Sequence, residues 1–277
     1  MVLTESDIRQ MVESVVKETR HVVDNALSKL GDMIYNTAIN GGGEICPEAI
    51  NSCNPYFKTD QPLKISVMNL PGSANARIDH KSGEIDIDPM TLKGVSAKEI
   101  IMHELSHYID LTKRMGTYTD DVGFPSAQFI DCCIYWFKPT EIQARLVEYA
   151  YRLKRSPRFA RYNLSHPVPN SSLRMKEMQE YINRIKSAKF DNTKLNADMA
   201  LVIGIFYQEA AKRAQRRHGT NVQGVKPYLK QLIDWQNMTP EDFETKRKLL
   251  LKIYEKRLRS MKNKALKIRY DALMSNQ

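Results

Sequence analysis

The 277-residue sequence has few cysteines, no long apolar run and no recognisable export signal. Its four cysteines include no CxxC pair, which excludes the usual structural zinc sites built from closely spaced cysteines. No apolar stretch approaches the roughly 18 residues that a membrane-spanning helix needs. The first residues lack a signal-peptide pattern, so we expect reduced cysteines and a cytoplasmic protein.

The charge balance is strongly basic, with a formal net charge of +10. Eleven Lys or Arg residues against five Asp or Glu residues lie between Glu241 and Gln277. Such an excess suits a nucleic acid, an acidic membrane surface or an acidic protein partner, whereas the plainer interpretation is a solvated helix face. The hydrophobic fraction of 42% allows a sizeable buried core and excludes disorder by composition.

The hydrophobic pattern indicates strands among helices in the first part of the chain. Apolar residues recur at helical spacing over 5–36, and a run of three glycines at 41–43 ends the pattern. Alternating residues predict a strand at 63–70 and a hairpin at 75–89. We therefore predict an α+β fold with a small antiparallel or mixed sheet.

A proline- and serine-rich segment, 156–172, predicts a linker. Before it lies a first domain, 1–155, in which one helix is expected to begin near Thr140. After it lies a basic helical region, 173–277, whose spacing indicates helices only.

The segment IIMHELSHYIDL carries the strongest chemical signal. On a helix, His103 and His107 are four residues apart and lie on one face, a spacing at which two imidazoles can bind one zinc ion. Glu104 follows the first histidine and is placed to take a proton from zinc-bound water and pass it to a leaving amine. The alternative interpretation is a surface histidine pair on an ordinary helix.

Zinc needs a third protein ligand, and the candidate is Glu141 in the segment KPTEIQARLVEY. A glutamate there could instead only complement the dipole at a helix N-terminus. Glu148, seven residues later on the same face, is a second candidate, followed by Asp120 and Asp121.

Residues that would support the three ligands are less well defined by the sequence. Asp110 shares a face with both histidines and could orient one of them by accepting its second N–H, although it could also be a surface aspartate. No single group is identified for oxyanion stabilisation. The candidates for that role are Tyr118, Arg145, Tyr149, Tyr151 and His166.

The motifs HELSH and TEIQAR, with the preceding GEIDIDP, resemble the zincin superfamily of zinc metallopeptidases, and more closely its gluzincin branch. The resemblance implies that His103, His107 and Glu141 bind zinc and that Glu104 is the base. It also implies that 83–89 is an edge strand that receives an extended peptide by β-augmentation.

HELSHYID followed by a PTEIQAR-type helix is also similar to uncharacterised peptidase-like proteins of tailed bacteriophages. This similarity implies the host cytoplasm or the virion as the location. The sequence thus predicts a zinc-dependent peptidase acting on a protein or peptide. The alternative is a virion-associated structural or binding protein that retains a zincin domain, with the basic region 173–277 contacting DNA or a protein partner.

Overall fold

The computed structural model describes residues 25–53, 58–72, 74–79, 82–114, 128–165, 173–218 and 234–274. These residues cluster into two compact units. The mixed unit takes its described residues from 20–118, 140–173 and 263–277, and the helical unit takes its own from 119–139 and 174–262. The protein is mostly helical with one small mixed sheet, as expected for the α+β class.

The sheet of the mixed unit has four strands in the order β1-β2-β4-β3. They are β1 (Gly43–Ile45), β2 (Leu63–Val67), β3 (Ala76–Ile78) and β4 (Ile85–Ile87). β2 pairs with β4 in parallel, and the other two pairings are antiparallel. The predicted hairpin is confirmed, because β3 and β4 are antiparallel and Gly83 in their turn has a left-handed φ of 73°.

The expectation that 83–89 forms the sheet edge is wrong. β4 lies between β2 and β3, since its second side pairs with β2 in register from Ile65↔Ile85 to Val67↔Ile87. All three residues of β4 are buried, as a central strand requires. The strand of the hairpin that lies at the sheet edge is instead β3.

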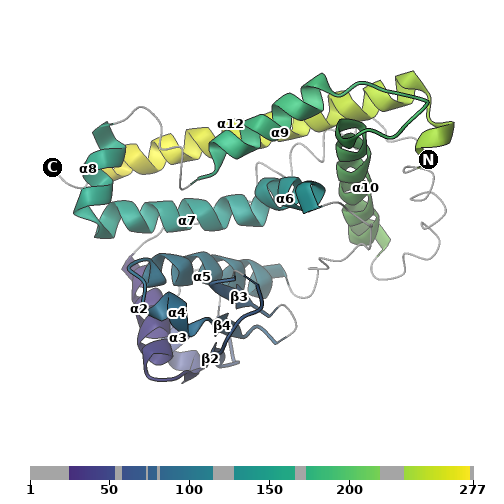
Figure 1. Cartoon of the computed structure of the whole chain (residues 1–277). Coiled ribbons are helices and arrows are strands. Elements are labelled where there is room, and N and C mark those ends of the chain that lie inside the picture. Colours follow the sequence, from purple (N-terminus) through teal and green to yellow (C-terminus); the bar gives the residue numbers. More distant parts are fainter. Residues whose placement is uncertain are drawn as a thin grey trace. The chain divides into compact units, whose positions relative to one another are not determined.

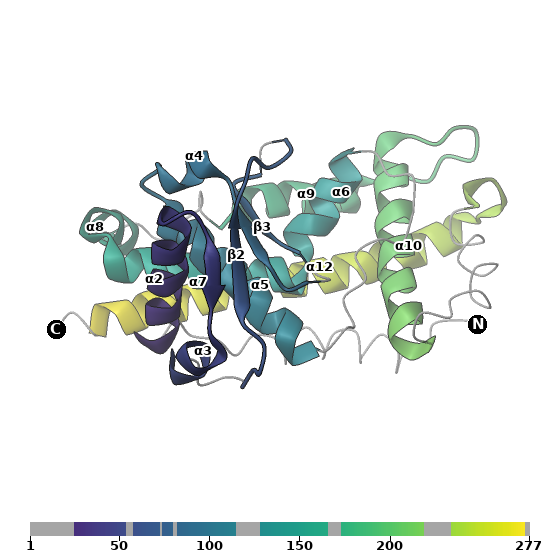
Figure 2. The same ribbon diagram turned by 90° about the horizontal axis from the view of Figure 1, so that it is seen from below.

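Two helices of the mixed unit, α2 (Asn25–Ile39) and α5 (Ala97–Arg114), pack against each other and against the strands (Figure 1, Figure 2). α5 presents Ile101, Leu105 and Tyr108 to the core, so the apolar stripe expected for this helix is buried. The remaining helices of this unit are α3 (Pro47–Cys53), α4 (Pro89–Leu92), α7 (Pro139–Arg155) and α8 (Pro157–Ser165), with the end of α12 (Pro240–Met274).

The part of the predicted linker 156–172 that the structure describes is helical, and 166–172 lie outside the described residues. Residues 157–165 form α8, because Pro157 occupies the first helical position, where a missing N–H has no cost. The ring of Phe159 packs edge-on against Tyr149 of α7, with ring centroids 5.8 Å apart. The domain division also differs from chain order, since residues 263–274 cluster with the mixed unit.

The helical unit contains α6 (Gln128–Phe137), α9 (Met175–Ser187), α10 (Ala197–His218), a 3-10 turn (Trp235–Asn237) and most of α12. Phe137 stacks on Tyr254 at 4.1 Å in its core. α12 begins at a Thr-Pro-Glu-Asp sequence, where Thr239 Oγ1 accepts a hydrogen bond from Asp242 N. None of the described helices combines the length and apolar character needed to cross a membrane.

The glycine run after α2 provides a test of the fold. Gly41 and Gly42 both have left-handed φ values, of 96° and 94°. A Cβ on Gly42 would lie 2.6 Å from the backbone oxygen of Ile65, whereas a Cβ on Gly41 would meet nothing within 4 Å. Gly42→Ala should therefore lower the free energy of unfolding by about 1–3 kcal/mol more than Gly41→Ala, measured by urea denaturation. Equal losses in the two variants would contradict the close approach of this turn to β2.

Candidate metal centre

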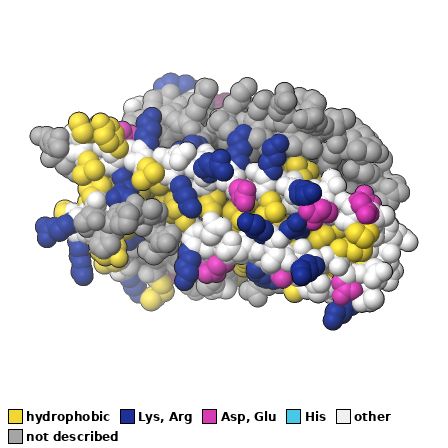
Figure 3. Space-filling view, turned by 90° about the horizontal axis from the view of Figure 1, so that it is seen from above, with side chains coloured by type: hydrophobic (Ala, Val, Ile, Leu, Met, Phe, Trp, Pro, Cys, Tyr) yellow, Lys and Arg dark blue, Asp and Glu magenta, His cyan; other side chains and the backbone are white. Residues whose placement is uncertain are grey.

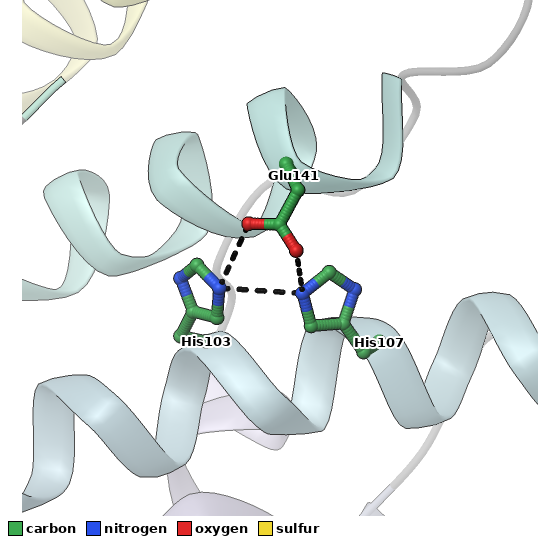
Figure 4. Close-up of side chains that lie close together, drawn as sticks. All are labelled: His103, His107 and Glu141. Atoms are coloured by element: carbon green, nitrogen blue, oxygen red, sulfur yellow. Dashed lines mark hydrogen bonds and ion pairs between the residues drawn. The ribbon is translucent and has the colours of Figure 1, made fainter. Parts of the chain in front are cut away.

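Two helices of the mixed unit bring three ligand-type side chains together. α5 carries His103 and His107 one turn apart, and α7 carries Glu141 in its first turn. Figure 4 shows the carboxylate of Glu141 pointing from α7 toward both imidazoles. Within the described part of the chain, these three are the His, Cys, Asp or Glu residues grouped closely enough to hold a metal ion.

The distances between the three side chains fit a common metal ion. Nε2 of His103 lies 3.2 Å from Nε2 of His107. Oε2 of Glu141 lies 3.4 Å from the first nitrogen, and Oε1 lies 3.1 Å from the second. Two atoms that bind one zinc ion at tetrahedral angles are about 3.3 Å apart, so these distances are compatible with one shared metal ion.

Because the side chains of His103, His107 and Glu141 are largely buried, the Glu141 carboxylate needs a positive charge beside it. The side chains of His103, His107 and Glu141 are only 14%, 10% and 8% exposed. Burial lowers the pKa of His103, but the Glu141 and Glu148 carboxylates outweigh it and raise that pKa to about 10. Burial raises the pKa of Glu141, but the two histidines outweigh it and hold that pKa well below its usual range. A metal ion would replace the proton on His103, because a coordinating imidazole must be neutral.

Glu148 approaches His103 from the other side of its ring. Oε2 of Glu148 lies 3.5 Å from Nδ1 of His103, while Nε2 of the same ring faces Glu141. A carboxylate at Nδ1 holds the proton on that nitrogen and leaves the Nε2 lone pair free for a metal. Glu148, the second candidate ligand, is not part of the three-residue group and contacts the opposite nitrogen of His103, while the orienting contact predicted for Asp110 lies outside the described residues.

The contacts between α5 and α7 form an antiparallel polar row. Glu99 pairs with Arg152 at 4.0 Å, His103 contacts Glu148, and His107 contacts Glu141. The three α5 residues are spaced by four, and their partners on α7 follow in the reverse order, as expected for antiparallel helices. The buried guanidinium of Arg145 also approaches Glu141, with 3.6 Å between Nη2 and Oε2, as their spacing of four residues predicts.

Glu104 is buried on α5, and its negative charge favours the protonated form of His103. Among the described residues, Glu104, Glu141 and Glu148 together with the cation Arg145 give the side chains around the imidazoles a formal charge of −2. A divalent ion between the neutral rings would balance that charge.

The other residues predicted for the site lie elsewhere or outside the described residues. Tyr118, Asp120, Asp121 and His166, and the side chain of Asp110, fall outside the described part. Tyr151 packs in the core of the mixed unit, and Tyr149 packs against Phe159. Of the residues considered for oxyanion stabilisation, the structure brings Arg145 to Glu141.

The chain matches no known protein-family model, no curated protein and no solved structure. The interpretation of the site therefore depends on its own geometry and chemistry.

The role of Glu148 can be tested by metal binding. Glu148→Ala should weaken zinc affinity about 10- to 100-fold, because His103 loses the group that orients it, while the protein still binds one zinc ion. His103→Ala should remove binding at the same zinc concentration, and Glu180→Gln, an exposed change on α9, should have no effect. Chelator competition would measure the three affinities. A loss for Glu148→Ala as complete as for His103→Ala would show that Glu148 is itself a ligand.

Proposed function

We propose that this protein is a zinc-dependent peptidase, with a metal site formed by His103, His107 and Glu141. The observation that carries the proposal is the triangle of two imidazole nitrogens and one carboxylate, with edges of 3.1 to 3.4 Å, beside a buried Glu104. Three protein ligands leave a fourth tetrahedral position open, which is typical of catalytic rather than structural zinc sites.

The donor set favours zinc over the commoner hard cations. Calcium and magnesium prefer oxygen ligands, and two of the three groups here are imidazoles. Two histidines and one carboxylate can also hold iron for oxygen chemistry. The second glutamate, Glu104, favours hydrolysis, because proton transfer to and from water needs a base that is not itself a ligand.

Each residue then has a defined role in hydrolysis. A zinc ion bound here would lower the pKa of its water toward neutrality and polarise the substrate carbonyl. Glu104 would accept a proton from the attacking water and deliver it to the leaving amine. Glu148 would hold the His103 ring in its metal-binding tautomer, and Arg145 would fix the Glu141 carboxylate.

The open sheet edge supports a peptide as the substrate. β3 is an edge strand and packs against α5, the helix that carries both histidines. Because β3 pairs with β4 in antiparallel fashion, the backbone N–H and C=O groups of every second β3 residue point away from β4. These residues are Ala76 and Ile78. An extended peptide could pair with those groups, which is the recognition mode of β-augmentation. With the HELSH motif on α5, this supports membership of the zincin superfamily.

Substitution of the base gives the direct test of the enzyme. Glu104→Gln should retain zinc but reduce hydrolysis of a mixed peptide library at least about 100-fold, because Gln cannot accept the proton. Glu48→Gln, an exposed change on α3, is the matched control and should retain full activity. Cleavage would be followed by mass spectrometry of the zinc-loaded proteins. Unchanged activity of Glu104→Gln, or no cleavage by the zinc-loaded parent protein, would refute the proposal.

A further inference from the structure

The long helix α12 carries a concentration of positive charge that neither the core nor the candidate metal centre uses. Residues 245–270 contain eleven Lys or Arg residues and one acidic residue, Glu255. The formal charge of this stretch, +10, equals that of the whole chain. The positive balance of the protein is therefore localised rather than spread over its surface.

Some of these cations serve the fold of the helical unit. Arg257 is buried and contacts both carboxylate oxygens of Glu209 on α10. Arg247 pairs with Glu244 and donates to the backbone oxygen of Lys186 at the end of α9. Arg257 and Arg247 are therefore each paired with a carboxylate, as cations in low-dielectric surroundings require.

Five other cations lie on the opposite side of the same helix. Lys248, Lys252, Lys256, Arg259 and Lys262 are separated by steps of four, four, three and three residues, so they share one face. Four of them are exposed and Lys256 is half-buried. We call these five residues the basic face, and one exposed acidic residue, Glu255, lies among them between Lys252 and Arg259. Lys248 has an ion pair to Glu244 at 3.6 Å, and within the described residues the other four have no carboxylate within 4.0 Å.

The space-filling view from above shows more Lys and Arg than Asp and Glu side chains on the visible surface, with hydrophobic side chains among them (Figure 3). From Lys248 to Lys262 the helix rises about 21 Å. One strand of a nucleic-acid duplex places a phosphate about every 3.4 Å, so about six phosphates fall within that length. Each strand winds around the duplex, so a straight row of cations on a rigid helix meets phosphates of both strands on the side of the duplex that faces it.

The apolar side of α12 argues against a membrane as the partner. Phe243, Leu250, Tyr254, Leu258 and Met261 are all buried in the helical unit. Between 240 and 262 no large apolar side chain of the described residues is exposed, whereas Leu266, Tyr270, Leu273 and Met274 are exposed farther along the helix. A helix that binds at a lipid interface must insert apolar side chains, and those beside the five cations are buried in the helical unit.

We propose that the basic face binds the phosphate backbone of double-stranded nucleic acid without reading the base sequence. Four of its five members are lysines, which contact phosphates as point charges and carry little base specificity. This function is separate from the proposed peptidase site, which lies on α5 and α7.

The test uses the full chain and a fluorescently labelled 30-base-pair DNA duplex, followed by anisotropy at increasing salt. Five phosphate contacts predict a slope of about −4.5 in log affinity against log salt, or about a 500-fold loss between 50 and 200 mM. A variant with all five residues of the basic face changed to Gln should lose this binding. The milder Lys252→Gln/Arg259→Gln variant should reduce the slope by about two.

The matched control removes the same amount of charge elsewhere. Five exposed lysines of the mixed unit are changed to Gln, namely Lys29, Lys58, Lys64, Lys93 and Lys154. This variant should keep the parent slope, and circular dichroism should show that every variant is folded. Equal loss in both five-residue variants would overturn the proposal, since it would show a response to net charge alone. Absence of duplex binding at 50 mM salt, or binding only to phosphatidylglycerol vesicles, would also overturn it.

Discussion

The contact between the Glu141 carboxylate and the imidazoles of His103 and His107 is the interaction on which the proposed chemistry depends. A carboxylate buried to this degree is strongly unfavourable unless a positive charge lies beside it. The surrounding side chains provide one guanidinium, from Arg145, against several glutamates. The raised pKa of His103 shows how the site meets this demand with a proton. A divalent metal ion would meet the same demand and would also join α5 to α7, which contact each other there through polar side chains.

The sheet has a supporting role in this arrangement. Pairing of β4 between β2 and β3 fixes the hairpin whose outer strand packs on α5. The buried stripe of α5 then faces the strands, so the two histidines are left on the side that meets α7. Among the described strands, β3 is an edge strand of the sheet and packs on the histidine helix. One packing arrangement thus positions both the proposed metal ligands and the proposed peptide-binding edge.

Much of this was predictable from sequence, because it depends on local periodicity. The spacing of His103 and His107, the hairpin turn at Gly83 and the start of the last helix each follow from short patterns. The structure brings Glu141 to the histidines across 34 residues, as the motif pair suggested. The contact between Glu148 and Nδ1 of His103 was not predicted. The seven-residue spacing shows only that Glu148 shares a helix face with Glu141, and does not show which histidine nitrogen it contacts. The central position of β4 was missed because strand order depends on the non-local pairing of β4 with β2. The helix α8 was missed because the prolines and serines of this segment were given more weight than its helical spacing.

We propose two separate functional elements, a metal centre in the mixed unit and a basic face in the helical unit. The central claim is that His103, His107 and Glu141 bind one zinc ion. Anomalous diffraction at the zinc absorption edge, on crystals grown with zinc, tests it most directly. We predict a single peak about 2.0–2.2 Å from both Nε2 atoms and from one carboxylate oxygen of Glu141. A zinc peak at other residues, or none between these side chains at saturating zinc, would contradict the account.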